Sequence, residues 1–261
     1  MEQPKAYKEL WKKVAEEYQE KNSELEWVPE CEEINLWTYW QGRGHYTPAV
    51  MVAGQDWGQG NNKAGLKFRE NAEKMNRNQE CSIFSGLEEK EMFPTDQNLI
   101  RLFKSMNLGY DSIERRQYED LFFTNICLGY RVHGSSGNFR KLWREHEEKD
   151  REHFRKLVSV LKPAIILCLG KDTFLSVVRA LEGTRIRITK AYNYNQCIAD
   201  NCPRRILTKE GEVQVFALAH PGRMGTLNRN GGKSGTSLAR QEEDWKKVAE
   251  AIENCRKKRG D

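Results

Sequence analysis

Four short apolar runs alternate with amphipathic stretches along this chain. The runs are AVMVAG (49–54), LFFTNI (121–126), AIILCLG (164–170) and VQVFALA (213–219). Short runs rich in β-branched and aromatic residues predict strands, and their nearly continuous hydrophobicity predicts that helices cover both faces of the sheet. Helical patterns fall at roughly 4–21, 96–107, 144–161, 171–182 and 237–257. This order predicts the α/β class, a three-layer α/β/α sandwich around a four-stranded parallel sheet.

Two weaker runs, RIRIT (185–189) and RRILT (204–208), predict a hairpin beside the last strand. We find no internal repeat and no Pro-rich linker, so we expect residues 1–261 to form one domain. An N-terminal helical extension covers about 1–40. A long polar segment, about 59–92, contains no strand pattern and is predicted to be an insert, a length that is uncommon in compact domains unless the segment has a function.

The composition indicates a globular protein with a charged surface, since 38% of its residues are hydrophobic and 31% are charged. No run of about 18 apolar residues could cross a membrane, so we expect no membrane partner. The first residues, MEQPKAYKELWKKVAEEY, alternate acidic and basic side chains and contain no apolar signal region. We therefore expect a cytoplasmic protein.

The seven cysteines are scattered, which favours reduced thiols over a disulfide framework in a cytosolic protein. Cys197 and Cys202 form the only close pair, and no second pair follows at zinc-binding spacing. We therefore predict no metal site.

The net charge of +5 is concentrated in the last quarter of the chain. Residues 204–261 contain 13 Lys or Arg and 8 Asp or Glu, a balance of +5, so the preceding residues balance to zero. Such a segment could face phosphates, or it could be a solvated final helix whose cations complement the helix dipole.

Polar, glycine-rich segments follow all four predicted strands. They are GQDWGQGNNKAG, GYRVHGSSGN, GKDT and HPGRMGTLNRNGGKSG. Parallel α/β sheets bind ligands at the carboxyl ends of their strands, so these segments predict a site at one edge of the sheet.

Three side chains in these segments could carry chemistry. Asp56 follows the first strand between glycines, where a carboxylate could orient water or simply form a turn. His220 ends the fourth run and could point a ring nitrogen into the cleft or satisfy a local hydrogen bond. Asn125, at the tip of an apolar strand, needs partners, so it either ties loops together or contacts a ligand.

In combination, strand–GQD, strand–TN and strand–HP resemble the motifs of the uracil-DNA glycosylase superfamily. Gly-Asn-Phe-Arg (137–140) and the Lys-Pro-Ala-Ile-Ile strand (162–166) resemble its thermostable branch. The resemblance covers roughly residues 45 to 240. Each motif is weak alone, but three in the same order at strand ends are specific.

The resemblance implies a DNA glycosylase that flips a nucleotide out of the duplex, with DNA as its partner and with no need of a metal or organic cofactor. Asp56 would orient the attacking water and stabilise the cationic sugar, and His220 would donate a hydrogen bond to O2 of the leaving base. Gln55 and Asn125 would contact the base. We expect a monofunctional enzyme, since no lysine is placed for Schiff-base chemistry, and we expect a monomer.

Other roles in base flipping also follow only from the resemblance. The ring that stacks on the base is Phe93 or Phe84, and the sequence leaves both open. Met224 would insert into the gap left by the flipped base. The cations expected to meet phosphates are Arg223, Arg229 and Lys233.

Three departures from the family concern base recognition and the iron–sulfur cluster. Trp57 replaces a common Pro, and its ring could pack on the sugar or on the insert. Gly58 stands where the classical branch has a Tyr that blocks C5 of the base, so the pocket could admit C5-modified pyrimidines. The chain also lacks the closely spaced cysteines of the iron–sulfur branches.

The identity of the base stays open between uracil, for DNA repair, and bulky hydroxymethylcytosine-type bases of phage DNA, for anti-phage defence. A catalytically inactive DNA-binding module on the same fold is a third possibility. A nucleotide-binding protein is a fourth, although no GxxxxGK[ST] or strand-linked GxGxxG motif supports it.

Overall fold

The computed structural model describes residues 4–19, 25–26, 46–58, 94–110, 120–131, 141, 143–183, 194–199, 203–232 and 237–260. Its centre is a five-stranded sheet in the order β4-β2-β6-β8-β7. The strands are β2 (Val50–Gly54), β4 (Leu121–Asn125), β6 (Ile165–Leu169), β7 (Arg204–Thr208) and β8 (Gly211–Leu218). The four strands expected from the apolar runs are therefore confirmed in type and place.

The strand count and direction differ from the expectation of a four-stranded parallel sheet. Strands β4, β2, β6 and β8 are parallel, but β7 adds a fifth strand that is antiparallel to β8. Only Lys209 and Glu210 separate β7 from β8, and so short a turn can join only antiparallel strands. The strand expected at 204–208 is confirmed, but it forms its hairpin with the last strand, β8, itself. The other run of the expected hairpin, 185–189, lies outside the described residues.

Alternate residues of each parallel strand enter different cores, because successive side chains point to opposite faces of a sheet. Met51 and Phe122 face one core, which also contains Phe154 and Val177 from the helices on that side. Val52, one residue after Met51, faces the second core. The sheet is thus buried on both faces, as its continuous apolar runs predict.

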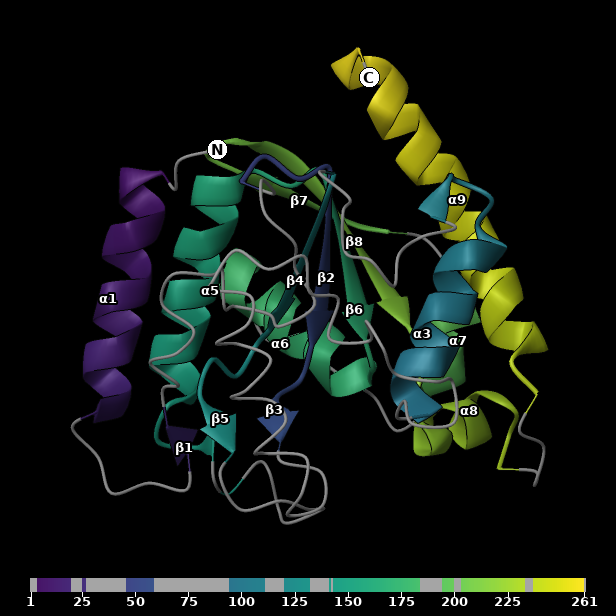
Figure 1. The fold of residues 1–261 in the computed structure, drawn as a ribbon, viewed down its shortest axis with the longest axis horizontal. Coiled ribbons are helices and arrows are strands. Elements are labelled where there is room, and N and C mark those ends of the chain that lie inside the picture. The colour runs from purple at the N-terminus through teal and green to yellow at the C-terminus, as the bar shows by residue number, and fades with distance from the viewer. Residues whose placement is uncertain are drawn as a thin grey trace, which may run out of the picture.

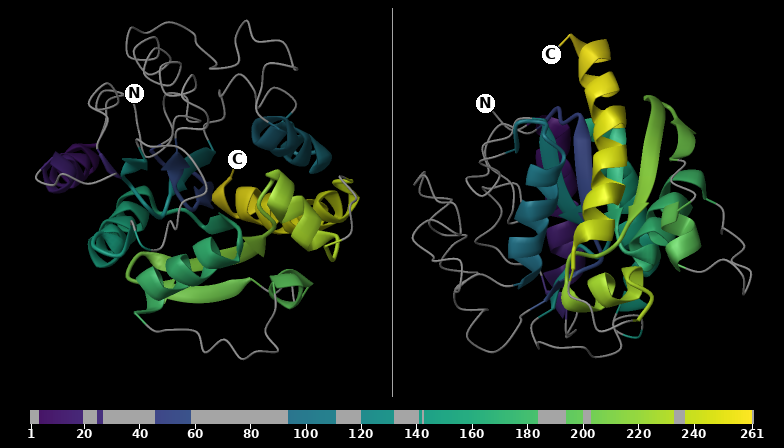
Figure 2. Two further views of the ribbon diagram at one scale, coloured as in Figure 1. Left: turned by 90° about the horizontal axis from the view of Figure 1, so that it is seen from below. Right: turned by 90° about the vertical axis from the view of Figure 1, so that its right-hand side faces the viewer.

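The helices form two outer layers around this sheet (Figure 1). One layer contains α1 (Lys5–Gln19), α5 (Glu147–Leu161) and α6 (Lys171–Glu182). The other contains α3 (Pro94–Ser105) and α9 (Ala239–Arg259). The turned views keep the strands between these two groups (Figure 2). No helix in the described part of the chain is long and apolar enough to cross a membrane.

Several shorter elements were not expected from the sequence. The helix α8 (Arg223–Arg229) lies in the polar segment after the fourth predicted strand, and α7 (Tyr194–Ala199) lies where no element was predicted. A small second sheet, in the order β1-β5-β3, joins β1 (Leu25–Glu26), β3 (Trp57–Gly58) and β5 (Tyr130–Arg131). The insert expected at 59–92 lies outside the described residues, as does most of the N-terminal extension beyond α1.

A buried carboxylate joins α1 and α5 to the segment that follows β4. Asp150 Oδ2 accepts hydrogen bonds from the Tyr18 hydroxyl at 2.6 Å and from Trp143 Nε1 at 2.7 Å. It also accepts one from the backbone N–H of Leu128 at 3.3 Å. Because Leu128 lies three residues after Asn125, this network holds the chain immediately beyond the carboxyl end of β4.

Replacing Asp150 by Asn should change how stability depends on pH. Burial raises the pKa of Asp150 from 3.8 to about 7, the hydrogen bonds from Tyr18 and Trp143 acting in the opposite direction. The folded chain therefore keeps a proton that the unfolded chain releases near pH 4, so stability from this group is lost as pH rises through 7. The amide introduced by Asp150→Asn cannot ionise, so the variant lacks this pH dependence. We therefore expect the natural chain to lose a few kcal/mol of stability relative to Asp150→Asn between pH 4 and 8.

Urea unfolding at several pH values measures this difference. A difference that stays constant between pH 4 and 8 would show that folding does not raise the pKa of Asp150.

Candidate active site

The carboxyl ends of β2 and β6 form a topological switch point. From β2 the chain continues to β4 on one side, whereas from β6 it continues to β8 on the other. Connections that leave two neighbouring strands in opposite directions open a crevice there, the usual ligand site of α/β sheets. The predicted site residues Asp56 and His220 follow β2 and β8, the two strands that flank β6.

Backbone pairing continues past the strand ends and positions Gln55 and Asp56. The N–H of Ile126 donates to the Gly54 carbonyl at 3.0 Å, and that of Cys127 donates to the Gln55 carbonyl at 2.9 Å. The Gln55 side-chain amide donates to Asp56 Oδ1 at 3.2 Å. Asp56 is half-buried at the edge of the sheet, and its Oδ2 is shielded from solvent.

Asn125 lies directly against the backbone of Gly54. The two residues are register partners at the ends of β4 and β2. A Cβ atom at position 54 would lie 2.2 Å from Asn125 Oδ1, so only glycine leaves room for the amide. The structure thus brings Asn125 beside the Gly54–Asp56 segment. Position 54 requires glycine because a larger residue would clash with the Asn125 side chain.

His220 is held as a neutral ring with a defined tautomer. Its Nδ1 accepts a hydrogen bond from the backbone N–H of Gly222 at 2.9 Å, so the ring hydrogen resides on Nε2. Solvent reaches the ring, yet enough protein surrounds it for burial to lower the pKa of His220 below the ordinary 6.5. At pH 7 the side chain is therefore an uncharged donor.

Three polar side chains that the sequence analysis did not identify hold the His220 loop. Gln241 donates from Nε2 to the carbonyls of Ala219 and His220, both at 3.2 Å. Its Oε1 accepts from the Thr226 hydroxyl at 2.9 Å. Asn98 Nδ2 donates to the carbonyl of Pro221 at 2.7 Å.

A signal for one of them existed in the sequence. Gln241 precedes Trp245, Val248 and Ile252 at helical spacing, and these three line the buried face of α9. A polar residue on an apolar helix stripe must find hydrogen-bond partners when buried.

The helix α8 presents the residues predicted to touch DNA in different ways. Met224 has 66% of its side chain exposed, and Arg223 beside it is also exposed. Arg229 instead forms a paired contact with Asp244, Nε to Oδ2 at 2.6 Å and Nη2 to Oδ1 at 2.8 Å. That ion pair ties α8 to α9, and a phosphate contact by Arg229 stays a prediction.

The remaining predicted residues are only partly described. Phe84, Phe93 and Lys233 lie outside the described residues, although α3 begins at Pro94, immediately after Phe93. Trp57 and Gly58 form β3, which pairs in parallel with Tyr130 and Arg131 of β5. The segment that begins with Gln55 and Asp56 therefore continues directly into β3, which belongs to the small second sheet.

Ligands for a metal ion do not gather in the part of the chain that the structure describes, where no cluster of three or more His, Cys, Asp or Glu side chains has the required geometry. Cys127, whose N–H pairs with the Gln55 carbonyl, is buried, and burial followed by the charges of Asp150 and Asp56 raises its pKa. It is therefore a neutral thiol at pH 7.

The family model of the uracil DNA glycosylase superfamily matches residues 41–248. The chain belongs to this superfamily, and the match includes all four parallel strands with the segments that follow them. Membership indicates DNA glycosylase activity. No curated protein matches the sequence.

Stability measurements on Gly54 and Asn125 test the close approach that positions the amide. Gly54→Ala adds a Cβ that must displace Asn125 Oδ1, so we expect a loss of about 1–3 kcal/mol, the usual cost of overpacking. In the Asn125→Ala background that oxygen is absent, and the same substitution should cost much less. A double-mutant cycle measured by urea unfolding gives the coupling between the two residues.

Additive effects of the two substitutions would contradict the contact. Asn125→Ala alone provides the matched reference, because it removes the amide without adding an atom near Gly54.

Proposed function

We propose that this chain hydrolyses the N-glycosidic bond of a pyrimidine nucleotide flipped out of DNA, leaving an abasic site. One observation carries the proposal: Asp56 and His220 follow two strands that flank β6, at the switch point of the sheet. Two strand spacings separate their strands, about 10 Å, a gap suited to a nucleoside between them. Asn125 lies on the Asp56 side, against Gly54.

The proposed roles follow the charges that develop as the bond breaks. The bond between C1′ of the sugar and the base nitrogen takes its electron pair to the base, leaving a cationic sugar and an anionic base. The Asp56 carboxylate stabilises the cation and orients the water whose oxygen bonds to C1′. Asp56 then accepts the proton that this water loses.

His220 stabilises the departing base as a neutral donor. With its Nδ1 occupied by the Gly222 N–H, the ring presents Nε2–H to the oxygen at C2 of the base. A neutral donor already held in place loses little energy to reorganisation as negative charge grows, and such donors contribute a few kcal/mol. The lowered pKa of His220 supports this role, because a cationic ring would not persist at pH 7.

Recognition and flipping draw on the residues around this pair. The amides of Asn125 and Gln55 can present either oxygen or nitrogen, so they suit a uracil-type or a cytosine-type edge. Phe93 or Phe84 would stack on the base. The exposed Met224 fits the wedge that fills the vacated stack, with Arg223 on a neighbouring phosphate. Contacts of Lys233 and Arg229 with phosphates belong to the same proposal.

The substrate base is proposed as uracil or a C5-modified pyrimidine. Gly58 supports the second possibility, because no side chain at that position blocks C5. Removal of bulky hydroxymethylcytosine-type bases would make the protein an anti-phage enzyme, and removal of uracil would make it a repair enzyme. Because Trp57 also departs from the family pattern, a DNA-binding module without catalysis is the second candidate.

Incubation with modified oligonucleotides tests the reaction and the site together. Oligonucleotides that contain uracil, a thymine mismatch, hydroxymethylcytosine or glucosylated hydroxymethylcytosine are treated with alkali, and breaks are scored. We expect breaks from at least one base. Asp56→Asn should reduce the single-turnover rate at least 100-fold, and His220→Ala and Asn125→Ala by 10-fold or more.

Lys246→Gln, an exposed change on α9, serves as the control and should keep the full rate. Full activity of Asp56→Asn would refute the assignment of the site. If the natural chain binds DNA but produces no breaks, the alternative of a DNA-binding module without catalysis is supported instead.

Gly58→Tyr tests the proposed access to C5. A ring projecting from β3 should reduce excision of glucosylated or hydroxymethylated bases at least 10-fold, while leaving any excision of uracil within about twofold. The rates are compared on otherwise identical oligonucleotides. Equal losses on both kinds of base would mean that position 58 does not face C5.

A further inference from the structure

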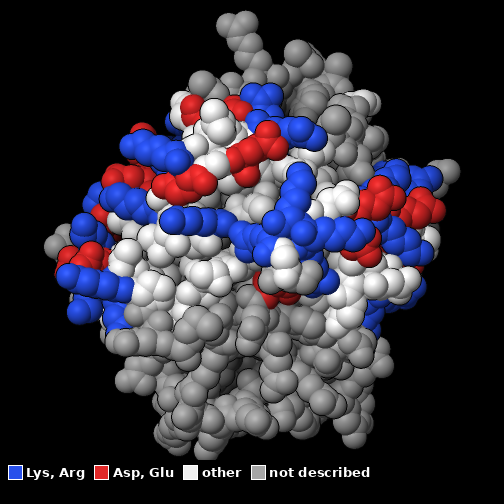
Figure 3. All heavy atoms as spheres, turned by 90° about the horizontal axis from the view of Figure 1, so that it is seen from above, with Lys and Arg blue, Asp and Glu red and all other residues white. Residues whose placement is uncertain are grey.

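A cluster of cations lies at the end of the molecule opposite the candidate active site. We call it the basic end and define it by Lys162, Lys257, Lys258 and Arg259, all exposed. Lys162 follows α5 just before β6 begins, and the other three form the last turn of α9. In the view from above, Lys and Arg side chains gather at the centre of this face (Figure 3).

Arg259 is held in place by the backbone at the amino edge of the sheet. Its guanidinium donates to the carbonyl of Lys162 at 3.0 Å and to that of Thr47 at 3.3 Å. These carbonyls belong to the segments that enter β6 and β2. Two of the five guanidinium N–H groups are thus used to fix the side chain, and the others remain available to bind phosphate oxygens.

Within the described part of the chain, little negative charge offsets the basic end. None of its four residues forms an ion pair there, whereas the adjacent Arg256 is paired with Asp120. The pKa of Glu210 is lowered mainly by its hydrogen bond from Ser159 and also by the charge of Lys162. The carboxyl ends of α5 and α9 each contribute about half a negative charge, which offsets roughly one of the four cations. Complementing the helix dipoles therefore does not account for the whole cluster.

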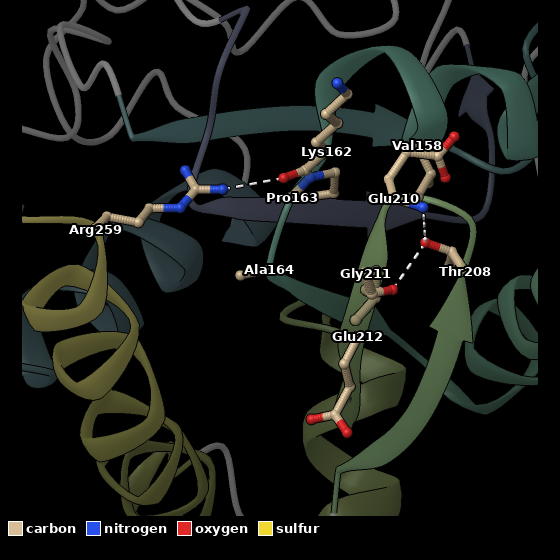
Figure 4. A pocket seen from close by; sticks show the side chains of 10 residues that line it. Val158, Lys162, Pro163, Ala164, Thr208, Glu210, Gly211, Glu212 and Arg259 are labelled. Carbon is tan, nitrogen blue, oxygen red and sulfur yellow. Dashed lines mark hydrogen bonds between the residues drawn. The ribbon is translucent and has the colours of Figure 1, made fainter.

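A depression of about 180 Å³ adjoins the basic end, with Lys162 and Arg259 in its lining (Figure 4). Glu210 and Glu212 line it too, so it does not suit a small anion inside. Glu212 lies 4.0 Å from Arg205, and Glu210 accepts a hydrogen bond from Ser159. An anionic partner would instead lie across the exposed cations.

The chemistry of the basic end favours a phosphate backbone over a protein. Three of its four residues are lysines, which are depleted at protein interfaces, and it contains no aromatic anchor. Flexible ammonium groups suit phosphates without reading sequence. The strands separate this end from the active-site edge by about 17 Å, so DNA bound at one edge does not cover the other.

We propose that the basic end binds the phosphate backbone of a second DNA segment while the active site holds the first. This inference rests on the proposed function, since it assumes DNA at the active-site edge. One molecule would then bridge two segments, which lets an enzyme searching for rare bases pass from one segment to another.

A bridging assay tests the proposal. A duplex without modified bases is immobilised on beads, and the full chain and then a fluorescent duplex are added. We expect the natural chain to retain the fluorescent duplex and Lys257→Glu/Lys258→Glu to retain at least fivefold less. In that variant, the slope of the logarithm of retention against the logarithm of salt concentration should also be smaller by about 2, because each lost lysine removes one phosphate contact.

Lys246→Glu/Lys247→Glu is the matched control. Both lysines are exposed on the same helix, about 15 Å from the basic end, and the net charge changes equally. The control should bridge as the natural chain does. Equal losses in both variants would show a general charge effect and overturn the proposal.

Three further outcomes would also overturn it. In the first two, the natural chain fails to bridge duplexes at any concentration, or it bridges them only at concentrations where sedimentation detects dimers. The third is that labelled polyglutamate, added instead of the fluorescent duplex, is retained as well as the duplex is. Excision rates on a short oligonucleotide should be unchanged in Lys257→Glu/Lys258→Glu. If the natural chain bridges duplexes but excises no base, the proposed function fails while the basic end keeps its role.

Discussion

Parallel pairing of β2 with β4 on one side and β6 on the other is the constraint on which the site depends. The register places Gly54 opposite Asn125 and continues through the backbone bond from Cys127 to Gln55. Because both faces of these strands are buried, a slip of one residue would move every side chain into the opposite core, whose packing it does not match. The core therefore sets the place of the acidic residue and the amide with little freedom.

The other half of the site depends on polar contacts instead of strand register. The His220 loop leaves the sheet after β8 and is held by Gln241 from α9 and Asn98 from α3. A Cβ at Gly225 would lie 2.0 Å from the His220 carbonyl oxygen, so α8 also approaches this loop closely. Two helices of one outer layer thus orient the histidine, which makes its geometry sensitive to changes far along the chain.

Charge is distributed unequally between the two ends of the sheet. At the carboxyl end, Asp56 is the described carboxylate of the site and the histidine is neutral. At the amino end, cations accumulate where two helices finish and the strands begin. Cations of the basic C-terminal quarter consequently lie at both ends, Arg223 in α8 after the His220 loop and the others in the last turn of α9.

The sequence by itself determined the four parallel strands, the long helices and the positions of Asp56, Asn125 and His220, because hydrophobic period and strand-end motifs are local properties. It indicated RRILT as part of a hairpin beside the last strand, but not that this run pairs directly with that strand as the fifth strand of the sheet. Tertiary structure alone decided that Arg229 pairs with Asp244, that Gln241 holds the His220 loop and that Gly54 makes room for Asn125. Each of these depends on contacts between residues distant in sequence, which no local pattern encodes.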